Sequence, residues 1–164
     1  MRFEEDKVHS IVPREKGELL AKNELVSRSV IKVLIREATE AMKRSYTPYS
    51  DFKVGSALLT VNQKIYTGCN IENAAYTPTN CAERTAFFKA VSEGEKDFAA
   101  IAIVGGKDGE LRDYCPPCGV CRQVIREFVD PQKFLVIVAK SEDDYLVYFL
   151  EELLPMSFGP SFLE

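Results

Sequence analysis

The sequence predicts an α/β fold in which helices cover one sheet. Short apolar runs of strand length alternate with segments whose apolar residues recur every three or four positions, which is the spacing of an amphipathic helix. Two of the short runs are separated by a polar turn, which indicates an antiparallel hairpin at one side of the sheet. The chain has 164 residues, of which 46% are hydrophobic, and this size and composition suit one compact domain.

The overall charge argues against a nucleic-acid partner. The formal net charge is −4, and a mildly acidic chain lacks the basic face that a phosphate backbone requires. The apolar runs fall well short of the ~20 residues of a membrane helix. The first residues, Met1 to Lys7, are charged and unlike a signal peptide. We therefore expect a cytoplasmic protein without a membrane partner.

The cysteine content indicates a metal or catalytic site. Five cysteines are an odd number in a chain too large to need disulfides, and in a reducing compartment they favour metal binding or catalysis. The single histidine, His9, lies near the N-terminus, where we expect it on the surface. A zinc site elsewhere must therefore use cysteine ligands.

The N-terminal part of the chain divides at about residue 25. We expect residues 1–25 to form an arm of unknown role and residues 26–164 to form a single domain. Residues 24–44 carry apolar side chains at helical spacing and predict an amphipathic helix that covers the core. Its apolar residues are Val26, Val30, Val33, Leu34, Ala38, Ala41 and Met42.

A hairpin and a second helix follow. Residues 54–60 and 64–69 read as its two strands, with Asn62 and Gln63 as the tight turn. Residues 70–80 are polar, contain a proline, and predict a loop. A helix is expected from Cys81 to Gly94, with one apolar side formed by Ala82, Ala86, Phe87, Ala90 and Val91.

The remaining chain repeats the alternation. Residues 98–104 predict a strand closed by Gly105 and Gly106, and residues 107–117 predict a loop. A helix over residues 118–129 should bury Val120, Val124, Ile125 and Phe128. The last elements are strands at 134–139 and 145–149 and a helical turn at 149–154. The aromatic residues expected in the core are Phe87, Phe88, Phe128 and Phe134.

Three cysteines and one glutamate indicate a zinc site. Cys118 and Cys121 are i and i+3 neighbours in the first turn of a predicted helix, and Cys81 also begins a helical segment. A helix N-terminus favours the thiolate, which is the form that binds zinc. Three protein ligands leave one position for water, as in catalytic sites, and Glu83 is placed to move a proton of that water.

The charge of such a site needs compensation. Three thiolates on one divalent ion leave a net charge of minus one, so a donor to the sulfurs is expected, and Arg84 suits this role. Cys115 is read as a non-ligand because the prolines after it disfavour a helix. A buried thiol pair or an incomplete structural site is the open alternative for Cys118 and Cys121.

From about Ala38 to Leu163 the chain resembles the cytidine deaminase family, specifically its small homotetrameric branch. A cysteine-x-glutamate segment followed by Pro-Cys-x-x-Cys is a signature of zinc deaminases in their three-cysteine form. The motifs that carry the resemblance are PYS (48–50), FKVGSAL (52–58), GCNIEN (68–73), CAERTA (81–86), PCGVCRQ (117–123), LLP (153–155) and FGP (158–160).

The resemblance implies a three-layer α/β/α fold with a mixed five-stranded sheet. It implies hydrolytic removal of the 4-amino group of cytidine or deoxycytidine, giving uridine or deoxyuridine and ammonia, as in pyrimidine salvage. Zinc-activated water would attack C4, and Glu83 would protonate N3 and then the leaving amine. Residues 26–164 would be the catalytic domain, and the homotetramer would place its sites at subunit interfaces.

The resemblance also assigns substrate contacts. Asn70 and Glu72 would hold the ribose 3'-hydroxyl, and Phe52 would pack on the base. The other residues implied are Tyr76, Ala82 and Phe158 at the substrate, Phe158 from across a subunit interface, and Arg84 and Gln123 as donors to ligand sulfurs.

Two alternatives remain open. One is a deaminase of a modified aminopyrimidine nucleoside, such as an aminonucleoside antibiotic; the presence of both Asn70 and Glu72 favours cytidine over it. The other is a zinc-stabilised binding protein without turnover, against which Glu83 and the open coordination position argue. The segment 77–80 departs from the usual family pattern, and its proline is placed to alter substrate preference.

Overall fold

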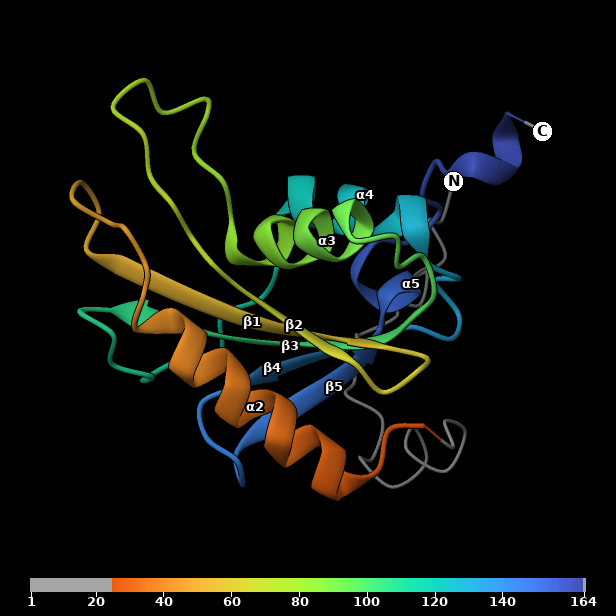
Figure 1. Ribbon diagram of the computed structural model, residues 1–164, viewed down its shortest axis with the longest axis horizontal. Helices are drawn as coiled ribbons and strands as arrows, with labels where there is room; N and C mark the ends of the chain where they lie inside the picture. The colour runs from red at the N-terminus through yellow and green to blue at the C-terminus, as the bar shows by residue number, and fades with distance from the viewer. Residues whose placement is uncertain (1–24, 164) are drawn as a thin grey trace, which may run out of the picture.

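The computed structural model describes residues 25–163, and within them five strands form one mixed sheet in the order β2-β1-β3-β4-β5. Elements keep the labels of Figure 1. Their bounds are α2 Arg28–Met42, β1 Phe52–Thr60, β2 Ile65–Cys69, α3 Ala82–Ser92, β3 Phe98–Lys107, α4 Gly119–Phe128, β4 Leu135–Ala139, β5 Tyr145–Phe149, α5 Leu150–Leu153 and the 3₁₀ turn η1 Pro160–Phe162.

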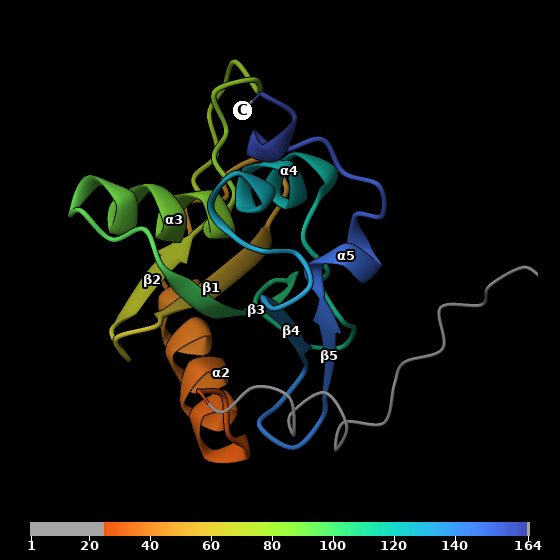
Figure 2. The same ribbon diagram turned by 90° about the vertical axis from the view of Figure 1, so that its right-hand side faces the viewer.

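The sheet is the middle of three layers. Helix α2 lies on one face, and α3, α4 and α5 lie on the other (Figures 1 and 2). This is the three-layer α/β/α architecture that the resemblance implied. Strands β3 and β4 are parallel, whereas the other neighbouring pairs are antiparallel. The expected arm over residues 1–25 and the surface position of His9 lie outside the described residues, apart from Leu25.

Helix α2 begins with a serine cap. The hydroxyl of Ser27 accepts a hydrogen bond from the backbone N–H of Val30 (3.3 Å), which satisfies one free donor of the first turn. Its buried face includes Ile31 and Ile35. The prediction that Val33 belongs to this face was wrong, because Val33 lies about 200° round the helix from Ile31 and is exposed.

Two glycines let the helices approach the sheet closely. A Cβ on Gly55 would lie 2.0 Å from the carbonyl oxygen of Ala38 in α2. A Cβ on Gly68 would lie 2.2 Å from the carbonyl oxygen of Ala82 in α3. Both glycines belong to the paired strands β1 and β2, so the hairpin carries one helix against each face. The first turn of α3 is thereby fixed directly over β2.

Strand β3 is longer than predicted. It does not stop at Gly105 and Gly106 but runs on to Lys107, which pairs with Phe52 at the start of β1. A Cβ on Gly106 would lie 1.8 Å from the carbonyl oxygen of Glu110, so the following turn folds back over the strand. Gly106 therefore allows the turn to pack closely on the strand, and the glycines do not end it.

Two apolar clusters fill the spaces between the layers. One lies between the sheet and α2, and the other between the sheet and the helices of the opposite face. The ring of Phe87 packs against Phe98, Phe128 and Phe134 in the second cluster. Phe88 is 47% exposed, so its predicted core position was wrong.

The apolar face predicted for α4 was also partly wrong. Ile125 is buried, but Val120 is exposed because the start of α4, including Cys118 and Gly119, is not covered by other described residues. None of the helices within residues 25–163 combines the length and the apolar character needed to cross a membrane.

Candidate metal centre and active site

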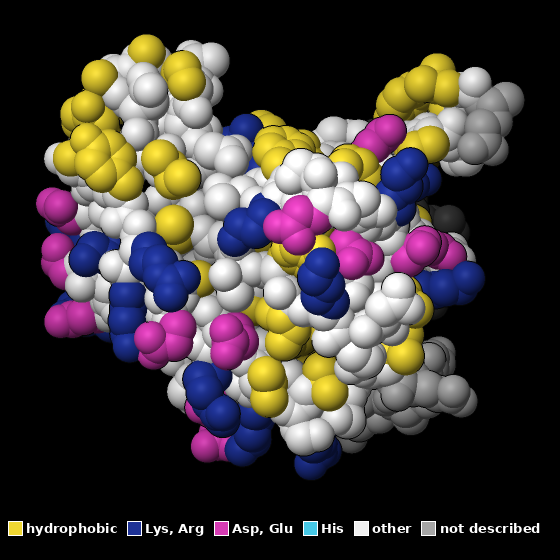
Figure 3. All heavy atoms as spheres, viewed as in Figure 1, with side chains coloured by type: hydrophobic (Ala, Val, Ile, Leu, Met, Phe, Trp, Pro, Cys, Tyr) yellow, Lys and Arg dark blue, Asp and Glu magenta, His cyan; other side chains and the backbone are white. Residues whose placement is uncertain are grey.

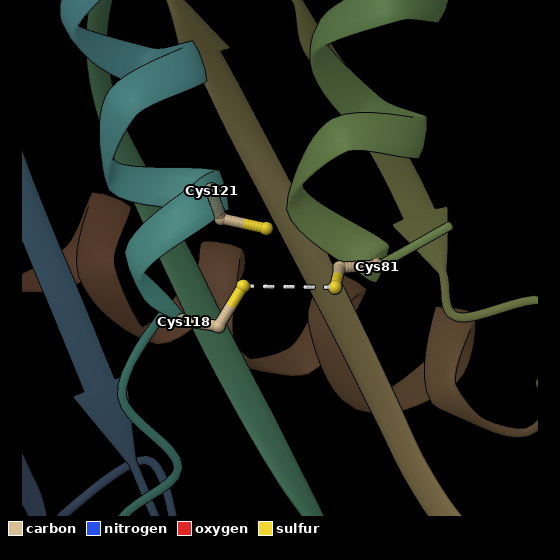
Figure 4. A group of neighbouring side chains, drawn as sticks. All are labelled: Cys81, Cys118 and Cys121. Carbon is tan, nitrogen blue, oxygen red and sulfur yellow. Dashed lines mark hydrogen bonds between the residues drawn. The ribbon is translucent and has the colours of Figure 1, made fainter. Parts of the chain in front are cut away.

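The first turns of α3 and α4 lie next to each other and carry three cysteines (Figure 4). Cys81 and Cys118 occupy the N-cap positions of the two helices, with extended backbone angles, and neither side chain makes a capping hydrogen bond. Cys121 lies one turn into α4 and is buried. The structure therefore brings together the three sulfurs that the sequence singled out.

The spacing of the sulfurs fits a zinc ion. The Cys81 and Cys118 Sγ atoms are 3.9 Å apart, and all three Sγ atoms lie within 4.8 Å of one another. A zinc–sulfur bond is about 2.3 Å long, so tetrahedral ligands are about 3.8 Å apart. Cys115 lies outside this group, with its Sγ 2.9 Å from where a Cβ on Gly105 would be. The cluster thus supplies three ligands.

The three neighbouring sulfurs affect one another's protonation. A hydrogen bond with Cys121, helped by the Arg84 guanidinium, lowers the pKa of the Cys81 thiol to about 5. The same hydrogen bond and burial raise the pKa of Cys121. One sulfur therefore ionises at the expense of its neighbour, and three adjacent thiolates require a positive ion between them. Zinc is the cofactor of this site.

Arg84 supports the first ligand. Its Nη2 atom donates to the Thr79 carbonyl oxygen (2.9 Å) and lies 3.6 Å from the Cys81 sulfur as a donor. Its Nε atom is buried and has no acceptor among the described residues. A guanidinium held in this way places positive charge beside the ligand sulfurs. The contact is the one that the resemblance implied for Arg84.

Glu83 is a buried carboxyl beside the cluster. It is 4% exposed, and burial is the main cause that raises its pKa to about 7, with the Cys81 thiolate adding to the effect. Its own backbone N–H opposes the rise by donating to the carboxylate. A group with this pKa both gives and accepts protons near neutral pH, as a general acid and base must.

Sequence reasoning missed one residue beneath Glu83. Ser56 is fully buried, and its hydroxyl donates to the Ala82 carbonyl oxygen at 2.9 Å. This carbonyl belongs to the peptide that joins Ala82 to Glu83. The signal in the sequence is a serine inside the apolar run of β1, where a buried hydroxyl needs a partner.

Asn70 and Glu72 hold the chain that leads into β1. The Asn70 side chain accepts from the backbone N–H of Val54 and donates to the carbonyl oxygen of Phe52, both at 2.8 Å. Glu72 accepts from the Tyr49 N–H at 2.9 Å and from the Ser50 hydroxyl. The Ser50 hydrogen bond is the main cause that lowers the pKa of Glu72, which keeps the carboxylate charged.

Phe52 lies at the rim of a cavity. The cavity has a volume of about 300 Å³, and Phe52, Gly105, Arg112 and Cys115 are among its lining residues. Phe52 itself is exposed. Burial raises the pKa of Cys115 to about 11, so this thiol stays neutral beside the cluster.

Two predicted substrate contacts project outward. The loop over residues 70–80 extends from the body of the molecule (Figures 1 and 2), and within it Tyr76 is 74% exposed, with its ring 6.1 Å from that of Tyr49. Phe158 is 58% exposed near the C-terminus. Gln123 donates to the Phe158 carbonyl oxygen (3.0 Å) and so contacts the C-terminal segment, whereas the resemblance implies a ligand sulfur as its acceptor.

Comparison with known proteins agrees with this site. The family described as "Cytidine and deoxycytidylate deaminase zinc-binding region" matches residues 28–138. A cytidine deaminase of Sporosarcina psychrophila is 47% identical over 79% of this chain and 91% of its own length. One of Halalkalibacterium halodurans is 46% identical over 77% and 92%.

Solved structures show the same relationship. The crystal structure of a cytidine deaminase from Burkholderia pseudomallei covers 77% of this chain and 97% of its own, with 44% identity and a TM-score of 0.70. That of a cytidine deaminase from Mycobacterium tuberculosis covers 78% and 96%, with 36% identity and a TM-score of 0.67. The fold, the three-cysteine cluster and these matches lead to one conclusion: the chain belongs to the cytidine deaminase family.

Proposed function

We propose that this protein catalyses zinc-dependent hydrolytic deamination of cytidine and deoxycytidine to uridine and deoxyuridine, with release of ammonia. The observation that carries the proposal is the placement of Glu83, a buried carboxyl with a pKa near 7, two residues from one sulfur of a three-cysteine cluster. A purely structural zinc site has four protein ligands and needs no such acid.

The residues of the chain divide the chemistry between them. Cys81, Cys118 and Cys121 hold the zinc ion, which when bound lowers the pKa of a coordinated water to roughly 7. Glu83 takes one proton from that water and delivers it to N3 of the base as the water oxygen bonds to C4. It then takes the remaining proton of that oxygen and passes it to the amine, so that the C4–N bond breaks and ammonia leaves. Arg84 donates to the Cys81 sulfur and so draws negative charge away from the cluster.

The nucleoside is held from one side by the start of β1 and the loop after β2. We assign Phe52 to the base and Asn70 and Glu72 to the ribose 3'-hydroxyl. Both polar side chains are already fixed by hydrogen bonds to neighbouring backbone groups, so they meet the substrate in one orientation. Ala82 is assigned to the substrate through the first turn of α3.

We further propose a homotetramer with sites at subunit interfaces, in the cytoplasm. Figure 3 shows hydrophobic side chains gathered on the projecting loop and again on the C-terminal segment. Exposed aromatic residues there include Tyr76 and Phe158, and a protein–protein interface would cover such groups. In the assembly, Tyr76 contacts the substrate, and Phe158 reaches the site from across a subunit interface. A site of three thiolates suits a reducing compartment.

The test is an ultraviolet assay of cytidine loss. The protein with one zinc per chain should deaminate cytidine and deoxycytidine, and a zinc chelator should abolish the activity. Glu83→Gln should retain zinc and lose activity by about 10²–10⁴-fold, because the proton carrier is gone. A zinc-loaded protein that turns over no cytosine nucleoside would refute the proposal, and a panel with cytidine monophosphate and aminopyrimidine antibiotics would define the substrate.

A further inference from the structure

Helix α4 holds the C-terminal segment with three side chains. Arg122 and Gln123 are adjacent in the helix whose start carries Cys118 and Cys121, and Arg126 follows about one turn later. The contacts are Arg122 Nη1 to the Leu153 carbonyl oxygen (2.7 Å), Gln123 Nε2 to the Phe158 carbonyl oxygen (3.0 Å) and Arg126 Nε to the Ser157 hydroxyl (3.1 Å).

Arg126 also fits against a glycine. A Cβ on Gly159 would lie 2.5 Å from Cζ and 2.7 and 2.8 Å from the two terminal nitrogens of Arg126. The guanidinium therefore lies flat on the backbone at Gly159. The φ of Gly159 is −161°, an extended conformation that any residue adopts. Glycine is required here for space, and the space is taken by Arg126.

Phe158 stands between the two residues that Arg126 contacts. Ser157 precedes it and bonds to Arg126 Nε, while Gly159 follows it and lies under the guanidinium. The Phe158 ring is exposed and stacks on Phe162, with centroids 5.3 Å apart and an angle of 20° between the rings. Arg126 thus holds the Ser157 side chain before Phe158 and the Gly159 backbone after it, and the stacking on Phe162 restricts the rotamers of the Phe158 ring.

We infer that Arg126 is a positioning residue for Phe158: by bonding to Ser157 and lying against Gly159, it presents the Phe158 ring to the nucleoside site of the partner subunit. The inference rests on the proposed function, in which Phe158 reaches that site. Gln123 supports the same arrangement through the Phe158 carbonyl oxygen. A ring ordered before the substrate arrives loses little conformational freedom on binding, so the device acts on substrate affinity.

A double-mutant cycle with Arg126→Ala and Gly159→Ala tests the inference. Arg126→Ala should raise KM for cytidine about tenfold and change kcat by less than about twofold, as for the loss of a charged hydrogen bond that acts on binding. Gly159→Ala should do the same because its methyl group displaces the guanidinium. The double variant should resemble either single variant, since each removes the same contact. If the two increases in KM multiply in the double variant, the inference is overturned.

A second readout follows the C-terminal segment without using activity. The chain contains no tryptophan, so Phe162→Trp introduces a single fluorescent reporter whose ring should stack on Phe158. In this background Arg126→Ala should red-shift the emission and increase quenching by acrylamide. The matched control is Arg36→Ala, which removes an exposed guanidinium bonded to Glu142 on the opposite side of the sheet and should change neither KM nor the emission.

The outcomes separate the inference from the proposed function. Release of the reporter without a change in KM would show that Arg126 holds the segment but does not position Phe158 for the reaction, and would overturn the inference. An unchanged reporter and KM would overturn it as well. A wild-type protein without cytidine turnover, in which Arg126→Ala still releases the reporter, would refute the proposed function and leave the contact between α4 and the segment established.

Discussion

The N-terminus of α2 differs from those of α3 and α4 in what its cap residue does. At α2 the Ser27 hydroxyl accepts a hydrogen bond from the first turn. At α3 and α4 the equivalent positions are Cys81 and Cys118, and their side chains make no capping hydrogen bond. A serine cap contributes about 1 kcal/mol, which the two cysteine-capped helices forgo.

The difference shows how one local position serves stability in one helix and chemistry in two others. The positive end of a helix favours an anion, and at α3 and α4 that anion is a ligand thiolate. These helices are held instead by packing, α3 directly over Gly68 and both through the aromatic cluster around Phe87. Variants at the cap residues and beside the cluster should therefore affect catalysis and stability separately.

Cys118→Ser should abolish zinc binding and turnover and should stabilise the metal-free protein. Serine binds zinc poorly, so zinc should be lost and cytidine turnover should fall to background. A serine is also a good N-cap. The free energy of unfolding of the metal-free variant should therefore be about 0.5–2 kcal/mol higher than that of the metal-free wild type. Zinc analysis, the cytidine assay and urea unfolding in chelator measure these effects. A variant with full zinc and turnover would remove Cys118 from the ligand set.

Arg84→Ala should have an intermediate effect. It removes the donor to the Cys81 sulfur and the positive charge beside the cluster, and such supporting contacts typically account for about 10–100-fold in metal affinity or activity. Chelator competition and the cytidine assay measure the loss, with Arg36→Ala as the control for removing an arginine. Wild-type activity with full zinc content would exclude this role for Arg84.

Ser27→Ala should affect stability alone. It removes the cap of α2, which lies on the face of the sheet opposite the cluster. The free energy of unfolding should therefore fall by about 1 kcal/mol, while zinc content and turnover stay unchanged. Urea unfolding of the zinc-loaded protein measures the effect. A loss of turnover without a loss of stability would show that the two faces of the sheet are not independent in the way described.

Local patterns predicted the order of helices and strands but not the coverage of their faces. Helical periodicity placed α2, yet its Val33 is exposed because periodicity alone does not say which side another layer covers. Phe88 in α3 was expected in the core as an aromatic residue and is exposed as well. Gly105 and Gly106 looked like a strand end, and pairing of Lys107 with Phe52 in the neighbouring strand kept the backbone extended. Each difference arises from tertiary contacts that a local pattern does not contain.

The site was predictable where its geometry is local. Cys118 and Cys121 are one turn apart, and motif order joined them to Cys81 at another helix start. The partner of Gln123 was not predictable, because it depends on the path of a segment more than thirty residues away. Ser56 was missed for the same reason, since its acceptor at Ala82 lies in another element.

The central claim is a zinc ion bound by three sulfurs with one open position. X-ray absorption spectroscopy of the zinc-loaded protein tests it most directly, because it counts ligand atoms by type and distance. We predict three sulfur atoms at about 2.3 Å and one oxygen at about 2.0 Å. Four sulfur atoms would mean that Cys115 or another cysteine closes the site, and that result would contradict the account.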